Sequence, residues 1–514
     1  MTERVVNVLY IDCDSLRADH LGCYGYDRDT SPTIDALAER GRRFENHYAS
    51  DTPCLPSRTA LFTGRFGFHT GVMNHGGLNA DPRPIGSRRD FRGLGDFHTW
   101  PEAMDRAGYD TALISPFPSR HGAYHVLDGF NEWIDTGENG RETAEEVSAA
   151  ATAWLDDTGG DDWYLHLNFW DPHTPYRTPL SYGNPFADEP APEWLTDETI
   201  AAHRDLPGPF SARDLHFYWS GVGPEESPAV KDRMPDEIRD REDFGHLVDG
   251  YDTGIRYMDD HIGALLDVLD ERDALAETLI VVTADHGESL GERNVYADHA
   301  TADELTVNLP LIIAGPGVEP GVDTELRYHL DLPPTVVEFI GGEPGPRWDG
   351  TSFADALTGT DATAGGRTHV VTSTAAWAVE RTVRWDNYLL VRTFHDAYKD
   401  LPPTQLFDVE SDPHLTTDLA EAKPGVVDRG IRHLDTWKSE RLMDTARDRA
   451  GGNPDAPRSP ADPLWEVLTG DGPFHPDGLD EYLDRLRATG RSDHAETLEG
   501  TKGFVTQNWP ANDR

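Results

Sequence analysis

Residues 50–65, with the sequence SDTPCLPSRTALFTGR, place a cysteine directly before a Leu-Pro-Ser-Arg run. The pattern predicts a short helix with Cys54 and Pro56 in its first turn, where the missing N–H of proline costs nothing. Arg58 follows four residues later on the same helix face, and Gly64 suits the helix end. A nucleophile at Cys54 would meet the positive end of the helix dipole and a guanidinium, which suits a sulfate or phosphate. The plain alternative is a buried, inert cysteine.

Two pairs of metal-ligand residues follow apolar runs that are typical of strands. Asp12 and Asp14 end the run VVNVLYI (5–11), and because they lie two residues apart, their side chains share one face of the strand. Asp285 and His286 follow the run TLIVVTA (278–284). Carboxylate oxygens suit Ca²⁺ or Mg²⁺, while one imidazole leaves Mn²⁺ and Zn²⁺ open. A single acid at a strand end is common, so the metal hypothesis depends on the convergence of these residues.

The elements that must bring these residues together are alternating strands and helices. Further apolar runs occur at 111–115, 163–170 and 309–315, and residues 244–271 carry apolar side chains at helical spacing. The alternation predicts an α/β fold with a large, mostly parallel central sheet flanked by helices. Ligands of such sheets bind beyond the carboxyl ends of the strands. The side chains expected at that edge are Asp12, Asp14, His173, Asp285 and His286.

The chain divides into three predicted regions. Residues 1–370 form the catalytic domain, which ends near the Pro/Gly-rich stretch GGEPGPRWDG (341–350). Residues 378–394 alternate like antiparallel strands, so we expect a smaller C-terminal antiparallel-sheet subdomain over 371–436. The polar, helix-prone residues 437–514 are interpreted as a peripheral helical and loop extension.

The composition is strongly acidic, with a net charge of −48 and only five lysines, and the acids are spread along the whole chain. A nucleic-acid partner is not expected, because phosphate binding requires clustered Lys and Arg. The 13 Trp and 19 Phe residues argue against a disordered acidic protein. We therefore interpret the charge as that of a folded halophilic protein, whose self-repulsion is screened by high salt.

No targeting signal is visible and cysteines are few, and we therefore expect a cytoplasmic location. The first residues run into a strand without the charged and apolar regions of a signal peptide. No apolar run reaches the length of a membrane span, so no membrane partner is expected. Three cysteines, Cys13, Cys23 and Cys54, are too few for a disulfide framework.

The cysteine motif resembles a known family signature. Residues 54–58 (CLPSR), followed by TGR at 63–65, are similar to the sulfatase signature Cys-x-Pro-Ser-Arg with its trailing Thr-Gly-Arg. Seven further stretches resemble the family in the correct order over about residues 5–420, namely CDSLRADHLGCYGY, SPTIDALAERGRRFENHYAS, DPHTPY, YMDDHIGALLDVLDE, TLIVVTADHGESLGE, LPLIIAGPG and LFDVESDPH. One such motif alone is weak, but the ordered set is specific.

The resemblance implies an alkaline-phosphatase-like sandwich fold and hydrolysis of sulfate esters. In the family, a formylglycine-generating enzyme oxidises the signature cysteine to formylglycine. One hydroxyl of the hydrated aldehyde attacks sulfur and the alcohol leaves; the second hydroxyl then loses its proton and sulfate is released. By matched position, Asp14, Asp285, His286 and modified Cys54 hold a divalent metal, with Ca²⁺ favoured and Mg²⁺ or Mn²⁺ as alternatives. Arg58 and the metal would activate the attacking hydroxyl and neutralise developing charge.

This chain departs from the family pattern at three places. Ser15 stands where many relatives have a second consecutive acid, and Asp12 is a candidate replacement ligand. Both active-site lysines of the family are missing, because the matching stretches read SPFPSRHGAYH and NVYADHATADE. The candidate replacements, as donors to a sulfate oxygen or to a leaving group, are Arg120, His121 and His299. His173 in DPHTPY matches a position that contacts substrate, and His75 is a weaker candidate. Each histidine has the alternative of a purely structural role.

The same residues are compatible with several functions. The leading prediction is a sulfatase acting on a small-molecule or sugar sulfate ester. The nearest rival keeps the nucleophile but cleaves phosphodiesters or phosphonate monoesters, which the missing lysines would suit. A phosphomutase or alkaline phosphatase is disfavoured, because those relatives use Ser or Thr in place of Cys54. A non-catalytic relative that binds an anion and keeps Cys54 unmodified is the alternative outside enzymes.

Overall fold

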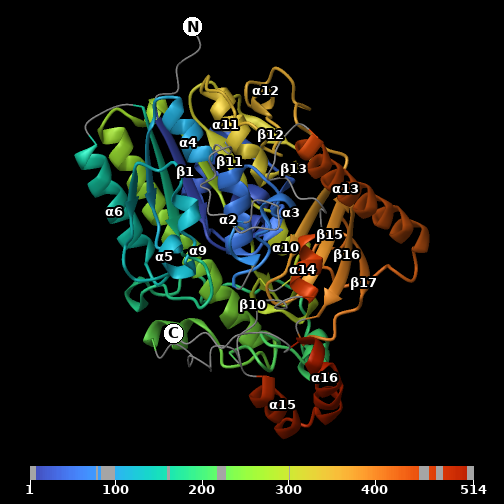
Figure 1. Ribbon diagram of the computed structural model, residues 1–514. Coiled ribbons are helices and arrows are strands. Elements are labelled where there is room, and N and C mark those ends of the chain that lie inside the picture. The colour runs from blue at the N-terminus through green and yellow to red at the C-terminus, as the bar shows by residue number, and fades with distance from the viewer. Residues whose placement is uncertain are drawn as a thin grey trace.

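The computed structural model describes residues 7–76, 79–82, 99–158, 162–216, 227–299, 301–396, 398–450, 462–469 and 479–505. Its centre is an eight-stranded sheet (Figure 1). In spatial order the strands are β12 (Gly321–Asp323), β2 (Arg42–Phe44), β11 (Leu311–Ala314), β8 (Thr278–Thr283), β1 (Asn7–Cys13), β7 (Trp163–Phe169), β5 (Asp110–Ile114) and β6 (Glu132–Ile134). Only β11 runs antiparallel to its neighbours β8 and β2. The predicted, mostly parallel central sheet is confirmed.

Helices cover both faces of this sheet because its central strands are apolar on both sides. Leu9 and Ile11 of β1 point into the core beneath α1 (Pro32–Arg40), α6 (Ala144–Asp157) and α9 (Arg241–Glu271). Val8 and Tyr10 point into the opposite core, beneath α4 (Trp100–Arg106), α11 (Leu332–Phe339) and α12 (Ala354–Leu357). The carboxyl ends of the parallel strands β1, β7 and β8 lie together at one edge of this helix–sheet–helix sandwich.

A second sheet forms the predicted antiparallel C-terminal subdomain, which is also confirmed. Its order is β17 (Thr404–Asp408), β16 (Tyr388–His395), β15 (Val379–Trp385), β14 (Val370–Thr374) and β4 (Asp51–Thr52), with α13 (Pro424–Ala450) packed against it. The edge strand β4 belongs to the N-terminal half and pairs in parallel with β14. Since β4 ends two residues before Cys54, the second sheet directly supports the segment that carries the cysteine motif.

The C-terminal helices contact the body of the protein through buried ion pairs. They are α14 (Pro463–Thr469), α15 (Leu479–Ala488) and α16 (Ser492–Val505). Arg491 and Arg485 hold the buried carboxylate of Asp214 at 2.7 and 2.5 Å. The predicted boundary at 436/437 falls inside α13, and residues 451–461, 470–478 and 506–514 of the predicted extension lie outside the described residues. The three-region division stays a prediction.

The remaining short elements connect these layers. They are β3 (His47–Tyr48), β9 (Ser289–Leu290), β10 (Tyr296–Asp298), β13 (Arg327–Tyr328), α3 (Gly67–Thr70), α5 (Phe117–His121), α7 (Asp197–Asp205), α8 (Pro228–Arg233) and α10 (Glu304–Val307). Among the described helices, none combines the length and apolar character needed to cross a bilayer.

A buried charge network joins the two sheets. Glu292 accepts hydrogen bonds from Arg17, which follows β1, at 3.1 and 3.3 Å. Its carboxylate also pairs with His414, which follows β17, at 3.0 Å. Burial, the largest single effect, would raise the pKa of Glu292, but the charge of Arg17 and the charge and hydrogen bond of His414 together outweigh it and lower that pKa to about 2. The ionised carboxylate therefore stabilises the contact between the two parts of the fold.

Replacing Glu292 by Gln is expected to remove part of the acid sensitivity of folding. The pKa is lower in the folded protein, so this stabilisation is complete above pH 4.5 and is lost as the pH falls toward 2. The shift corresponds to roughly 3 kcal/mol of unfolding free energy. Urea unfolding at pH 5, 4 and 3 should show a smaller loss of stability for Glu292→Gln than for the wild type. The control Glu421→Gln, at an exposed turn, should retain the wild-type dependence; equal slopes for Glu292→Gln and wild type would contradict the role.

Candidate active site

Helix α2 (Cys54–Thr63) presents Cys54 at its first position, as the sequence predicts. Pro53 precedes the helix, Pro56 lies in its first turn, and Gly64 ends it in the left-handed conformation. The hydroxyl of Ser57 donates to the backbone carbonyl of Asp285 at 2.6 Å and so ties α2 to the end of β8. Because all ten helical residues are buried, the position of Cys54 is set by packing on every side.

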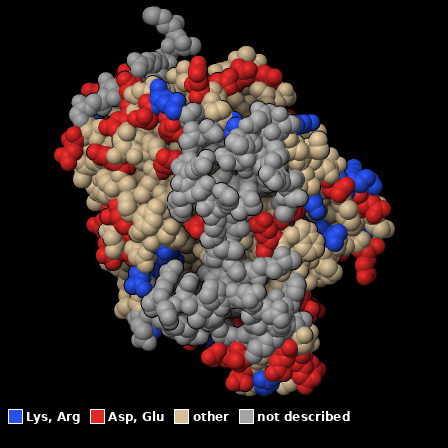
Figure 2. All heavy atoms as spheres, in the orientation of Figure 1, with Lys and Arg blue, Asp and Glu red and all other residues tan. Residues whose placement is uncertain are grey.

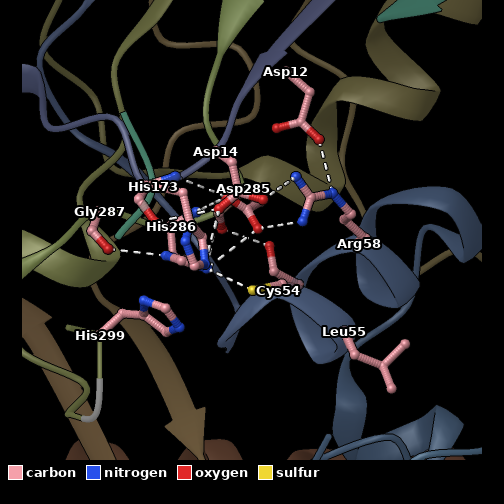
Figure 3. Close-up of polar contacts among 12 residues, drawn as sticks. Asp12, Asp14, Cys54, Leu55, Arg58, His173, Asp285, His286, Gly287 and His299 are labelled. Carbon is pink, nitrogen blue, oxygen red and sulfur yellow. Dashed lines mark hydrogen bonds and ion pairs between the residues drawn. The ribbon is translucent and has the colours of Figure 1, made fainter. Parts of the chain in front are cut away.

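The predicted ligands Asp14, Asp285 and His286 surround Cys54 (Figure 3). One ligand atom from each of these four residues lies within 4.8 Å of the others. Asp14 directly follows β1, and Asp285 and His286 follow β8, so neighbouring parallel strands deliver all three to the same edge. The Sγ atom of Cys54 is 3.0 Å from Nε2 of His286.

Arg58 occupies the centre of the acidic cluster rather than an open side of it. Its Nε donates to Asp12 at 2.9 Å, its Nη2 to Asp14 at 2.9 Å, and its Nη1 to Asp285 at 2.6 Å. Asp12 and Asp14 thus face the same neighbour, as their spacing predicts. Figure 3 shows Asp12 on the far side of Arg58 from Cys54, and Asp12 is not in the four-residue ligand group. Asp12 is therefore linked to the site by its hydrogen bond from the guanidinium of Arg58.

The donor set fits a divalent cation. Nδ1 of His286 lies 2.9 Å from the backbone carbonyl of Gly287, so this nitrogen carries the proton and Nε2 keeps its lone pair toward Cys54. Asp14 and Asp285 add carboxylate oxygens to that imidazole. Two carboxylates and one neutral imidazole form a hard, mainly oxygen-donating set, which Ca²⁺, Mg²⁺ and Mn²⁺ accept.

Burial dominates the electrostatics of the site. It raises the pKa of the Cys54 thiol, and the charges of Asp14 and Asp285 raise it further. Burial also raises the pKa of Asp285. At Asp14 burial is again the largest single effect, but Arg58, His173 and His286 together outweigh it and lower the pKa. A thiol under these conditions stays protonated and is a poor nucleophile in its own right.

Two of the predicted histidines approach the ligand group. Nε2 of His173 lies 3.9 Å from Asp14, and its Nδ1 contacts the backbone carbonyl of Thr174. The ring of His299 lies against that of His286 in a tilted arrangement, with 4.2 Å between centroids, and one of its nitrogens groups with Cys54 and His286. Burial lowers the pKa of His173 to about 3 and that of His299 well below its usual value. Both rings are neutral at pH 7 and present N–H or lone-pair groups to a ligand.

His121 is not a member of the ligand group. Its ring packs on Phe117 at 4.5 Å and on His75 at 5.0 Å between centroids. Nε2 of His75 accepts from the backbone N–H of Leu55 at 3.4 Å, next to Cys54. Of the two, His75, which the sequence ranks lower, is therefore closer to the start of α2.

The sequence gives only weak signals for the roles of two further residues of the site. Ser15 has a φ of 64° and donates its hydroxyl to Asp14 at 3.2 Å and its backbone N–H to Asp285 at 3.3 Å. A serine that stands where relatives have an acid thus positions two ligands. Glu288 accepts from the backbone N–H of Thr174 at 3.3 Å and links the His173 loop to the His286 strand end. Its place two residues after His286 is the only sequence signal for this role.

Comparisons with known proteins agree with this geometry. The family described as Sulfatase matches residues 6–342. A choline-sulfatase of Rhizobium meliloti is 28% identical over 486 residues, covering 84% of this chain and 85% of that protein. A solved structure of a protein in complex with its substrate D-glucosamine-2-N,6-O-disulfate is similar with a TM-score of 0.66 and 19% identity, covering 88% of this chain and 99% of that one. A phosphonate monoester hydrolase of Silicibacter pomeroyi has a TM-score of 0.64 and 23% identity, with 85% and 96% covered.

Proposed function

Because the chain belongs to the sulfatase family of hydrolases, we propose that it cleaves a sulfate ester with a formylglycine made from Cys54 and a bound divalent cation. The observation that carries this proposal is the grouping of Cys54 with Asp14, Asp285 and His286 within 4.8 Å at the first turn of α2. A hydroxyl of the hydrated aldehyde would supply the nucleophile, and the cation would polarise the sulfate. A formylglycine-generating enzyme is the partner that this maturation requires.

The chain's own residues would bind and orient the ester around that nucleophile. Asp14, Asp285 and His286 would hold the cation, with Ca²⁺ favoured by the carboxylate oxygens and Mg²⁺ or Mn²⁺ as alternatives. Arg58 would orient the two aspartates through its hydrogen bonds, and its charge opposes the effect of burial on the pKa of both. It also holds Asp12, whose position behind the guanidinium supports an orienting role rather than direct ligation.

The histidines would take the places of the missing lysines. His299, whose ring lies against that of His286, would donate to a sulfate oxygen or protonate the departing alcohol. An anion beside the ring favours the protonated imidazole, so substrate binding itself would raise the pKa of His299. Nε2 of His173 faces Asp14, from where it would accept a proton from the nucleophile or contact the ester. His121 would act through His75, against which it packs.

Mass spectrometry of the tryptic peptide 44–58 tests the modification. Exchange of sulfur and two hydrogens for one oxygen lowers the peptide mass by about 18 Da. We expect this loss in protein made in its native host, because the motif that begins at Cys54 is complete. The matched control is the peptide with Cys23, which should keep its thiol mass. A native protein with only unmodified Cys54 would leave an anion-binding relative as the better interpretation.

A phosphodiester or phosphonate monoester hydrolase is the second candidate function. It is supported by the absence of both family lysines and by the fold shared with a phosphonate monoester hydrolase. Turnover of 4-nitrophenyl phenylphosphonate that is faster than that of 4-nitrophenyl sulfate would favour this candidate.

The surface charge and the free cysteines support a proposal for the environment in which the protein works. Figure 2 shows Asp and Glu spread over the visible face, with far fewer Lys and Arg, consistent with the net charge of −48. This distribution supports our proposal of a halophilic protein that works at high salt. Cys13, Cys23 and Cys54 are all free thiols, which supports a reducing, cytoplasmic location.

A further inference from the structure

Cys54 and His286 belong to two overlapping groups of metal-ligand side chains. The first, described above, includes the carboxylates of Asp14 and Asp285. The second adds only the imidazole of His299, and one ligand atom from each of its three residues lies within 4.8 Å of the others. Its donors are one sulfur and two nitrogens, all from buried side chains. The second group is therefore soft, whereas the first is dominated by oxygen.

The distances in this second group suit a tetrahedral ion. Zinc binds sulfur at about 2.3 Å and imidazole nitrogen at about 2.0 Å, which places two tetrahedral ligand atoms roughly 3.5 Å apart. Sγ of Cys54 and Nε2 of His286 are 3.0 Å apart, so an outward movement of about half an ångström would admit the ion. The ring of His286 is already oriented for this, because its Nδ1 lies 2.9 Å from the carbonyl of Gly287 and its Nε2 keeps the lone pair.

His299 has a buried ring nitrogen without a hydrogen-bond partner among the described residues. This atom is Nδ1, and the nearby carboxylate of Asp298 is 3.7 Å away, too far for a hydrogen bond. Oδ2 of Asp298 is also buried without a partner in the described part of the chain. Buried polar atoms are nearly always paired, so such orphans require an explanation, and a bound ion is one. Figure 3 shows the ring of His299 turned toward His286 and Cys54.

The charges around this group favour a cation. Asp14 and Asp285 lie 3.9 and 3.3 Å from Nε2 of His286, and both share a single guanidinium, that of Arg58. A metal ion that binds Cys54 displaces the thiol proton to solvent and is held by the thiolate. A thiolate and two neutral imidazoles leave one positive charge on a divalent ion, and the neighbouring carboxylates balance it.

We propose that the unmodified chain binds Zn²⁺ through Cys54, His286 and His299, with a water molecule as the fourth ligand. Thiolate and imidazole are ligands that zinc prefers, whereas Ca²⁺ and Mg²⁺ prefer carboxylate oxygens. Oxidation of Cys54 to formylglycine removes the sulfur and leaves the oxygen-rich group of Asp14 and Asp285 as the metal site. The chemical state of residue 54 thus selects the metal. The zinc site requires only the thiol, whereas the exchange of metals rests on the proposed function.

The simpler alternative is that the thiol of Cys54 only donates a hydrogen bond to His286, and that any metal binds among the carboxylates. The two interpretations differ in whether a sulfur–metal bond forms and in whether His299 is needed. Co²⁺ distinguishes them, because it occupies zinc sites and gives a sulfur-to-cobalt charge-transfer band in the near ultraviolet when a thiolate binds it.

The test titrates Co²⁺ into the full, untagged chain made in a host without a formylglycine-generating enzyme, after mass spectrometry has confirmed the thiol at Cys54. We expect one Co²⁺ per chain with the charge-transfer band, which equimolar Zn²⁺ removes and excess Ca²⁺ does not. Cys54→Ala should abolish the band, and so should conversion of Cys54 to formylglycine. His299→Asn should weaken Co²⁺ binding about tenfold or more.

The matched control is His203→Asn, which removes a half-buried histidine that contacts Tyr296 and belongs to neither group. It should bind Co²⁺ as the wild type does. Thermal unfolding of each variant identifies any loss of fold, and His299→Gln serves if His299→Asn does not fold. A thiol protein without the band, or a Co²⁺ affinity that survives the loss of His299, would overturn the inference. A zinc-binding chain that keeps its thiol even in the native host would instead contradict only the proposed function.

Discussion

Replacing Cys54 by alanine is expected to abolish sulfate-ester hydrolysis, lowering kcat/KM by a factor on the order of 10⁵ or more. The substitution removes the atom from which the proposed nucleophile is made, while the surrounding acids and histidines remain. Cys54 is buried, so loss of its sulfur should cost only about 1 kcal/mol of unfolding free energy. Release of 4-nitrophenol from 4-nitrophenyl sulfate, measured beside urea unfolding, separates the two effects.

The matched control is Cys23→Ala, because Cys23 is another free thiol and does not belong to the ligand group. This variant should keep the wild-type rate. If Cys54→Ala retained activity within tenfold of wild type, the proposed nucleophile would be wrong, whatever the family signature implies.

Replacing Arg58 by methionine is expected to damage both folding and turnover. The guanidinium donates to three buried carboxylates, and its removal leaves them with uncompensated charge, a loss of about 3–5 kcal/mol. Because the aspartates would no longer be held in place, we expect kcat to fall by about 10²–10³ in the protein that remains folded. Added Ca²⁺ should recover part of the stability, since a bound cation replaces some of the missing positive charge.

A second buried arginine separates instability from catalysis. Arg327 is fully buried and pairs with Asp323 at 2.8 Å, outside the ligand group. Arg327→Met should lose comparable stability but retain kcat in the folded fraction. Unfolding curves with and without Ca²⁺, together with kcat at a temperature where both variants are folded, provide the comparison. An Arg58→Met variant with wild-type kcat would show that Arg58 has no part in orienting the site.

Local features of this protein follow from the sequence alone. Helix α2 begins at Cys54 and ends at Gly64 because proline near the start and glycine at the end act within one or two turns. The strands before Asp14 and Asp285 are apolar on both faces, so their burial in a parallel sheet, and the meeting of their ends, are readable from the pattern. The order of the motifs was enough to identify the family and the α/β class.

Only the tertiary structure decided which distant groups touch. Asp12 is an aspartate at the end of β1, the strand that Asp14 follows, yet it contacts Arg58 and is not in the ligand group. Strand β4 pairs with β14, from which it is separated by more than half of the chain. Arg120 and Arg177 bind the consecutive backbone carbonyls of Asn139 and Gly140. Periodicity and turn preferences act over a few residues, whereas these contacts depend on packing between segments whose separation in the chain carries no spacing signal.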